Sequence, residues 1–148
     1  MQTSCFSIAG RHAAAVSIAR FGPRWFHFTG GRYPALAPMP SMLNLPAADF
    51  DIAYARQLEA LNPQQVHSEL IALAGPNPIL LCHEKPEPAF DCHRLTVARW
   101  LEGALGISIP ELDAPLINRT IVSASAPAEA ERRRSLRRYS VPSPAAEA

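Results

Sequence analysis

Two short segments, Cys-His-Glu at 82–84 and Cys-His-Arg at 92–94, bring thiols, imidazoles, a carboxylate and a guanidinium close together in the sequence. Thiolates are nucleophiles and metal ligands, imidazoles and carboxylates transfer protons, and a guanidinium binds carboxylate or phosphate through paired hydrogen bonds. Side chains of such complementary chemistry in so short a stretch favour a reactive site.

Cys92 is the candidate nucleophile of this site. It stands where a helix is expected to begin, and the positive end of the helix dipole lowers the pKa of a thiol, although the neighbouring Asp91 acts in the opposite direction. His93 and Glu84 are the candidate proton donors and acceptors, and Cys82 is expected to line the pocket.

An anionic substrate is expected, because two arginines fall near the same place. Arg20 follows a predicted strand, and Arg94 lies in the first turn of a predicted helix, where unpaired backbone N–H groups attract anions. Tyr54 completes the predicted substrate-binding set, as a core side chain whose hydroxyl is directed to the edge of the site.

Two other uses of the cysteines stay open at the level of sequence. The Cys and His side chains suit zinc, but their spacing differs from common zinc motifs and the adjacent Cys92 and His93 are expected to diverge, so the predicted site contains no metal. A disulfide between Cys82 and Cys92 is the other alternative. No secretory signal is visible, which favours a cytoplasmic protein in reducing surroundings.

The elements that position these residues follow an α/β pattern. Two continuously apolar runs, 14–19 and 78–82, are typical of buried parallel strands. Apolar residues at helical spacing begin at Ala47, and a second helix is predicted between a cap at Asn62 and a stop at Gly75.

A third predicted helix is capped by Asp91 and ends at Gly106. Its inward face is predicted to carry Leu95, Ala98, Leu101 and Leu105. The long segment 21–46 has no helical period and is interpreted as a functional loop. This order predicts a small Rossmann-like three-layer α/β domain with a mostly parallel sheet.

The composition limits the classes of protein that fit. The chain has 148 residues, 48% of them hydrophobic, and a formal net charge of +1, so wholesale disorder and bulk electrostatic capture of nucleic acid are disfavoured. No apolar run is long enough to span a bilayer, so no membrane association is expected. Residues 1–120 are predicted to form one domain.

Residues 121–148 are predicted to be a flexible tail, because they hold few large apolar side chains and much Ala, Ser, Pro and Arg. A solubilising role is the leading interpretation of this tail. Contact with nucleic acid is the alternative, through Arg132, Arg133, Arg134, Arg137 and Arg138.

The segment ILLCHEKPEPAFDCHRLTVARWLEGALGISIPEL resembles the C-terminal signature of the domain of unknown function 488 family. In that family an apolar strand ends in Cys-x-Glu and Cys-His-Arg opens a helix, which correspond here to Cys82, Glu84 and 92–94. The upstream AVSIARFGPRW is similar to the family's first strand and places its arginine at Arg20. The resemblance covers about residues 5–112 and implies a Rossmann-like fold with a polar site, but no particular reaction.

The leading hypothesis is therefore an enzyme that acts on a nucleotide or another small anionic, nucleic-acid-related substrate at the carboxyl ends of the strands. A non-catalytic module that binds a phosphorylated ligand, and a zinc-stabilised interaction domain, are the alternatives. The sequence contains none of the familiar glycine-rich or metalloprotease motifs, so it identifies no cofactor, and it does not predict an oligomeric state.

Overall fold

The computed structural model of the chain describes residues 1–83 and 92–112. The strands are short, namely β1 (Gln2–Cys5), β2 (Ala15–Ser17), β3 (Gly31–Arg32) and β4 (Ile79–Cys82). The long helices are α2 (Ala47–Glu59), α3 (Pro63–Ala74) and α4 (His93–Leu105). Single helical turns form α1 (Phe6–Ala9), η1 (Pro34–Leu36) and η2 (Pro40–Met42).

Within the described residues, the strands form one parallel sheet in the order β1-β4-β2-β3. In the register of the sheet Cys82 pairs with Cys5, while Ser17 lies between Leu81 and Arg32. Because parallel strands all end at the same edge, Cys82, Ser17 and Arg32 meet at the carboxyl edge. The predicted α/β fold with a parallel sheet is confirmed.

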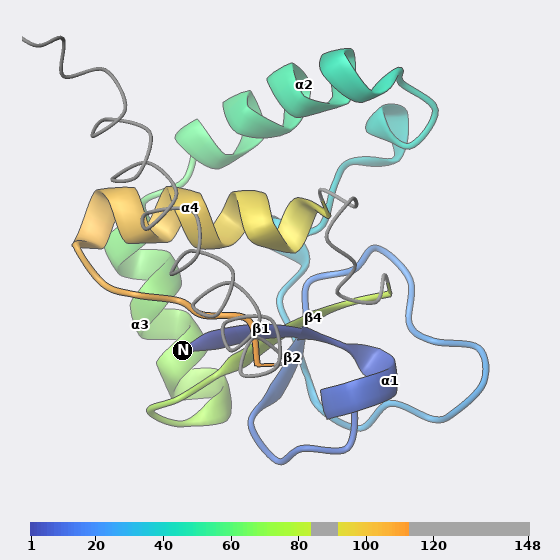
Figure 1. Cartoon of the computed structure of the whole chain (residues 1–148), viewed down its shortest axis with the longest axis vertical. Helices are drawn as coiled ribbons and strands as arrows, with labels where there is room; N and C mark the ends of the chain where they lie inside the picture. Colours follow the sequence, from blue (N-terminus) through green and yellow to red (C-terminus); the bar gives the residue numbers. More distant parts are fainter. Residues whose placement is uncertain (84–91, 113–148) are drawn as a thin grey trace, which may run out of the picture. The chain divides into compact units, whose positions relative to one another are not determined.

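The two faces of the sheet are covered unequally. On one face α2, α3 and α4 bury a core that includes Tyr54, Leu70 and Leu101 against Val16 and Leu80. In Figure 1, α2 and α4 lie above the strands and the short α1 lies below them. Most of the helical packing that holds the sheet is therefore on one side.

The second face is covered by α1 and by aromatic side chains of the loop that follows β2. Phe6 packs edge-on against Phe26 and Phe28, with ring centroids 6.5 Å and 5.2 Å apart. These rings join Ala15 and Leu81 in a second apolar cluster. Part of the long loop 21–46 thus serves the core.

Local sequence signals explain where α3 begins and ends. The side chain of Asn62 accepts a hydrogen bond from the backbone N–H of Gln65 at 3.1 Å, and Pro63 occupies the first helical position. Gly75 follows the last turn with φ of +84°, a backbone conformation that favours glycine. The predicted cap and stop of this helix are confirmed.

Helix α4 differs from its prediction at the start and along its inner face. Its N-cap is Cys92, so the predicted cap at Asp91, which itself lies outside the described residues, is wrong. Of the predicted inner face, Ala98 and Leu101 are buried and Leu105 packs against the core, while Arg94 and Val97 are buried in addition. Arg94 takes its buried place through the ion pair described below, and Leu95 is half-buried.

Two further differences concern the strands. β1 and β3 were not expected, since β1 carries the polar residues Gln2, Thr3 and Ser4, and β3 has only two residues. The predicted strand 14–19 is shorter than its apolar run, because β2 ends at Ser17 and Arg20 lies three residues beyond it. Just after β2, the backbone N–H of Ile18 still donates to the carbonyl oxygen of Leu81 at 3.1 Å.

No described helix combines the length and apolar character needed to cross a membrane. Residues Met1–Leu112 form one compact unit. The predicted domain boundary near residue 120, the predicted tail and its five arginines lie outside the described residues.

Candidate functional site

The cluster formed by Cys82, Cys92 and His93 lies where β4 ends and α4 begins. The Sγ atoms of Cys82 and Cys92 lie 3.5 Å and 3.8 Å from Nδ1 of His93, and all three ligand atoms fall within 4.8 Å of one another. Neither cysteine forms a disulfide. The expectation that Cys92 and His93 diverge is wrong, because the bend of the chain at the N-cap turns both side chains toward Cys82.

A backbone carbonyl fixes the orientation of the His93 ring. Nε2 lies 3.2 Å from the carbonyl oxygen of Ile18, which is only an acceptor, so Nε2 carries the hydrogen. In the neutral imidazole Nδ1 then presents its lone pair to the two sulfur atoms. A metal-binding histidine is typically held in this way by a carbonyl or carboxylate on its other nitrogen.

Tyr54 supports the same ring from the core. Its side chain is fully buried, its hydroxyl donates to the carbonyl oxygen of Leu36 at 2.6 Å, and its ring meets the ring of His93 at 90° with centroids 5.6 Å apart. Burial is the main reason that the pKa of the Tyr54 hydroxyl is raised. The structure therefore places Tyr54 beside the site residues, with its hydroxyl bound to backbone.

The pKa of the Cys92 thiol is lowered to about 6. A hydrogen bond with the Cys82 side chain is the largest cause, and the hydrogen bond and charge of His93 and the backbone of Arg94 act in the same direction, while burial opposes them. A thiol with this pKa is largely ionised at neutral pH, which suits it to nucleophilic attack or to metal binding.

A cavity of about 220 Å³ opens beside the cluster. Cys82 and His93 line it, and so does Arg20, which reaches it from the segment after β2. The other lining residues are Ala19, Phe21, Pro38, Leu43, Phe50 and His83. Cys92 is 4% exposed and is not among the lining residues, so a molecule in the cavity meets Cys82 and His93 first.

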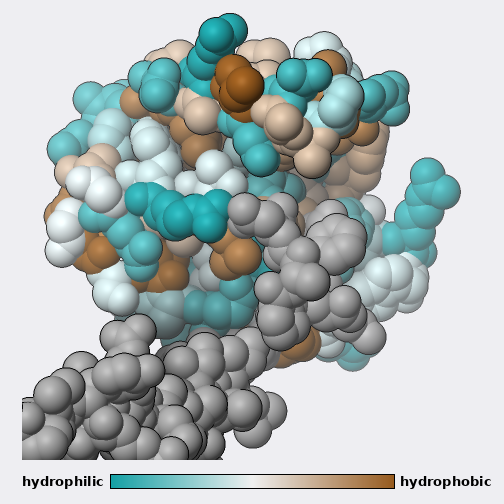
Figure 2. Space-filling view, turned by 45° about the horizontal axis from the view of Figure 1, so that its top comes forward, coloured by the Kyte–Doolittle hydropathy of each residue, from teal (hydrophilic) through white to brown (hydrophobic). Residues whose placement is uncertain are grey.

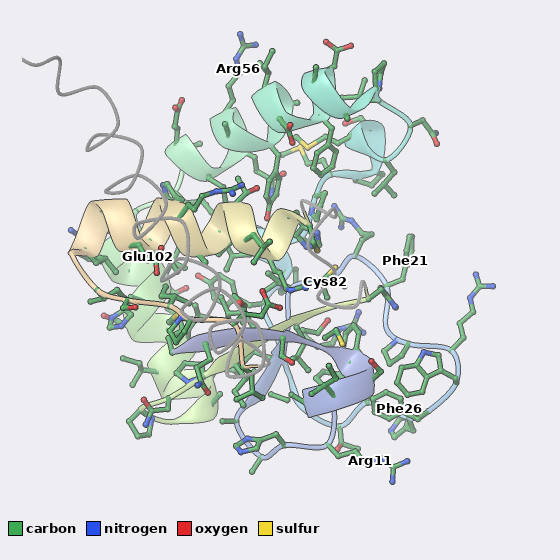
Figure 3. All side chains as sticks on the ribbon, viewed as in Figure 1. Arg11, Phe21, Phe26, Arg56, Cys82 and Glu102 are labelled. Carbon is green, nitrogen blue, oxygen red and sulfur yellow. The ribbon has the colours of Figure 1, made fainter. Side chains whose placement is uncertain are left out.

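Two polar side chains in the wall of this cavity are held by hydrogen bonds to backbone carbonyl groups. Arg20 donates from Nε to the carbonyl oxygen of Pro38 at 3.0 Å, and Nε2 of His83 lies 2.9 Å from the carbonyl oxygen of Phe21. Figure 3 shows Cys82 at the end of its strand and Phe21 on the loop that borders this region. The loop after β2 thus forms one side of the entrance.

Arg94 does not reach the cavity. Its side chain is 1% exposed, and its Nε donates to Oε1 of Glu111 at 2.9 Å in a buried ion pair. Burial alone would lower the pKa of Arg94, but the charges of Cys92 and Glu111 outweigh burial and raise it. The described partner of this guanidinium is therefore a carboxylate of the protein.

Glu111 is held in place by the segment that follows α4. The backbone N–H of Ile109 donates to Glu102 at 2.6 Å, and the backbone of Thr3 pairs with Pro110 and Leu112 at 3.0 Å and 2.7 Å. The segment therefore runs beside β1, and Glu111 reaches the first turn of α4. This arrangement ties the N-terminal turn of α4 to the edge of the sheet.

Of the predicted site residues, the structure brings together Cys82, Cys92, His93 and Tyr54, and Arg20 lines the same cavity as Cys82 and His93. Glu84 lies outside the described residues, and its predicted role in proton transfer stays a prediction.

Two functional contacts were missed by the sequence reasoning. The carbonyl of Ile18 has no sequence signal, because any residue supplies a backbone oxygen. Glu111 carried a weak sequence signal, because it is an acidic residue in the largely apolar segment 107–112, which follows the helix that carries Arg94.

Comparison with protein-family models, with curated proteins and with solved structures finds no match to this chain. On the face that Figure 2 shows, hydrophobic residues are interspersed with hydrophilic ones rather than gathered over one element.

Proposed function

We propose that the protein is a zinc-dependent enzyme that acts on a small anionic substrate, with Cys82, Cys92 and His93 as the metal ligands. Three ligand atoms converge beside a cavity that an arginine also lines, and this convergence carries the proposal. The proposal keeps the expected enzyme and anionic substrate, and it changes the role of Cys92 from nucleophile to ligand.

The distances support zinc in particular. In a tetrahedral site with Zn–S of about 2.3 Å and Zn–N of about 2.0 Å, a sulfur and a nitrogen ligand lie about 3.5 Å apart. The two separations between sulfur and Nδ1 are 3.5 Å and 3.8 Å. Both separations between sulfur and nitrogen therefore lie close to the tetrahedral value, and all three ligand atoms lie within 4.8 Å of one another.

The protonation states of the ligands support the same proposal. A zinc ligand must be a thiolate or a neutral imidazole, and the proton is lost when the metal binds. The lowered pKa of Cys92 favours its thiolate form near neutral pH, and the contact of His93 Nε2 with the carbonyl of Ile18 leaves Nδ1 as the nitrogen that would face the metal. Little free energy is then spent on removing the proton of Cys92.

A zinc ion with three protein ligands and one position open to a cavity is typical of catalytic rather than structural sites. Among the described residues no fourth Cys, His, Asp or Glu joins the cluster. The metal supplies polarisation of a substrate oxygen or a bound water of lowered pKa. Arg20, which lines the same cavity, is available to hold a negatively charged part of the substrate.

The metal content of the purified full chain tests this proposal. We expect about one zinc per chain, lost in Cys82→Ser and in His93→Gln, and we expect a chelator to lower the thermal midpoint. Cys5→Ser is the matched control, because Cys5 is equally buried and pairs with Cys82 in the sheet register but lies outside the cluster. Substoichiometric metal that the Cys82 and His93 variants leave unchanged would overturn the proposal.

A thiol enzyme without metal is the second candidate, favoured by the contact of Cys92 with His93 and Cys82 at the start of a helix. In this case Cys92 is the reactive thiolate and Cys82, which lines the cavity, is the residue nearest the substrate. A thiol enzyme is expected to keep its catalytic activity after the metal is removed, whereas a zinc-dependent enzyme is expected to lose it.

A cytoplasmic setting, which keeps cysteines reduced, is part of both candidates. Membership of the domain of unknown function 488 family is also proposed, supported by Cys-x-Glu at 82–84 and Cys-His-Arg at 92–94.

A further inference from the structure

A second cavity lies at the carboxyl edge of the sheet, next to the ends of β2 and β3. Its volume is about 380 Å³, and its walls come from Ser17, Ala19, Arg20, Arg32, Pro34 and Ala37. Ala19 and Arg20 also line the cavity beside the Cys82–Cys92–His93 cluster, so the two cavities share a wall.

The charged groups of this second cavity are both cationic. Arg32 is exposed and forms no hydrogen bond or ion pair with any described residue. Arg20 uses Nε for the carbonyl of Pro38, and its terminal nitrogen atoms have no partner in the described part of the chain. Among the described residues no carboxylate pairs with either guanidinium, so these residues give the cavity a net positive charge.

Ser17 contributes a hydroxyl group to the second cavity. Its side chain is 2% exposed, and Oγ is buried without a hydrogen-bond partner among the described residues. A buried polar atom in this state calls for an explanation, and a ligand is one. Ser17 and Arg32 are register neighbours in parallel strands, so their side chains leave the same face of the sheet.

We propose that Ser17, Arg20 and Arg32 form a binding site for the phosphoryl group of a phosphorylated substrate. A phosphoryl group offers several acceptor oxygens, which match two planar guanidinium forks and one hydroxyl donor. Ser17 itself lines the cavity, and its hydroxyl has staggered rotamers available about the Cα–Cβ bond.

The shared wall places this site next to the proposed metal centre. A substrate that spans Ala19 and Arg20 has its phosphoryl group in the second cavity and its reacting part beside Cys82 and His93. The inference deepens the proposed function, because it names the substrate class as phosphorylated. Binding of the phosphoryl group itself needs neither cysteine and no metal.

Isothermal titration of the full chain with inorganic phosphate, a nucleoside monophosphate and the matching nucleoside tests the inference. We expect the monophosphate to bind more tightly than phosphate, and the nucleoside to bind much more weakly. Loss of one hydrogen-bonded charged contact weakens binding by about tenfold or more, which is the effect expected for Arg32→Gln and Arg20→Gln. Ser17→Ala is expected to weaken binding less, because a neutral hydroxyl is lost.

Arg56→Gln is the matched control, because Arg56 is exposed on α2 and points away from the sheet in Figure 3. An Arg32→Gln affinity equal to that of Arg56→Gln would overturn the site. Equal affinities for phosphate and the monophosphate would overturn the assignment to a phosphorylated substrate. Cys82→Ser is expected to lose zinc and to keep phosphate affinity, so failure of the metal centre and failure of this site are distinguishable.

Discussion

Replacement of Glu111 by Gln tests the role of the buried ion pair with Arg94. The guanidinium is 1% exposed and the Glu111 side chain 13%, so solvent screens the pair weakly. Breaking a buried pair by removing one charge costs about 3–5 kcal/mol. Glutamine keeps the shape and one acceptor oxygen, so we expect a loss near the lower end, about 3 kcal/mol.

Urea denaturation of Glu111→Gln measures this loss. For a domain with an m-value of about 2 kcal/mol per molar urea, the expected shift of the midpoint is about 1.5 M. The matched control is Glu59→Gln, because Glu59 is an exposed residue of α2 and its loss is expected to shift the midpoint by little. A shift for Glu111→Gln equal to that of Glu59→Gln would refute the structural role of the pair.

The double variant Arg94→Met with Glu111→Leu replaces both charged side chains by apolar ones, so that neither charge is left buried without its partner. Replacement of a buried ion pair by apolar side chains is often neutral or stabilising, so much of the lost stability is expected to return. The phosphate affinity of this variant is expected to stay within about twofold of the unmodified chain, because Arg94 lines neither described cavity. A loss of phosphate binding in this variant would indicate that Arg94 binds the anion, as its place at the start of a predicted helix suggested.

Two further predictions concern the residues around His93. Tyr54→Phe leaves the buried carbonyl of Leu36 without its donor, so we expect a loss of about 1–3 kcal/mol in unfolding free energy with unchanged metal content, and a lower metal content would contradict this account. In metal-free protein, thiolate absorbance in the ultraviolet is expected to fall as the pH drops through about 6, because a lowered pKa keeps Cys92 ionised above that value. Cys92→Ser is expected to remove this step, and a step that remains would assign it to another group.

Sequence patterns predicted the helices and strands that are determined by residues close together in the chain. The cap at Asn62, the proline at Pro63 and the stop at Gly75 define α3 without help from the rest of the chain. β4 was predicted for the same reason, as an apolar run between turn residues. The short β3 was not, because two residues carry no pattern and the strand exists only through its pairing with β2.

The candidate site was predictable in its residue types but not in its geometry. The cluster of Cys82, Cys92 and His93 follows from one strand end and one helix start, which the sequence indicates. Whether adjacent side chains converge depends on the backbone at the N-cap, and whether Arg94 faces a ligand depends on Glu111, which arrives from a later segment. Both are long-range properties that spacing does not encode.

Cobalt(II) titration of the metal-free full chain tests the central claim most directly, because cobalt commonly replaces zinc and its absorption reports the ligands. We predict saturation at about one cobalt per chain, a thiolate-to-cobalt charge-transfer band, and a change in the visible bands when a small anion enters the cavity. Cys82→Ser is expected to weaken the charge-transfer band, while Cys5→Ser leaves it unchanged. Binding without a thiolate band, or no stoichiometric binding, would contradict a metal centre at Cys82, Cys92 and His93.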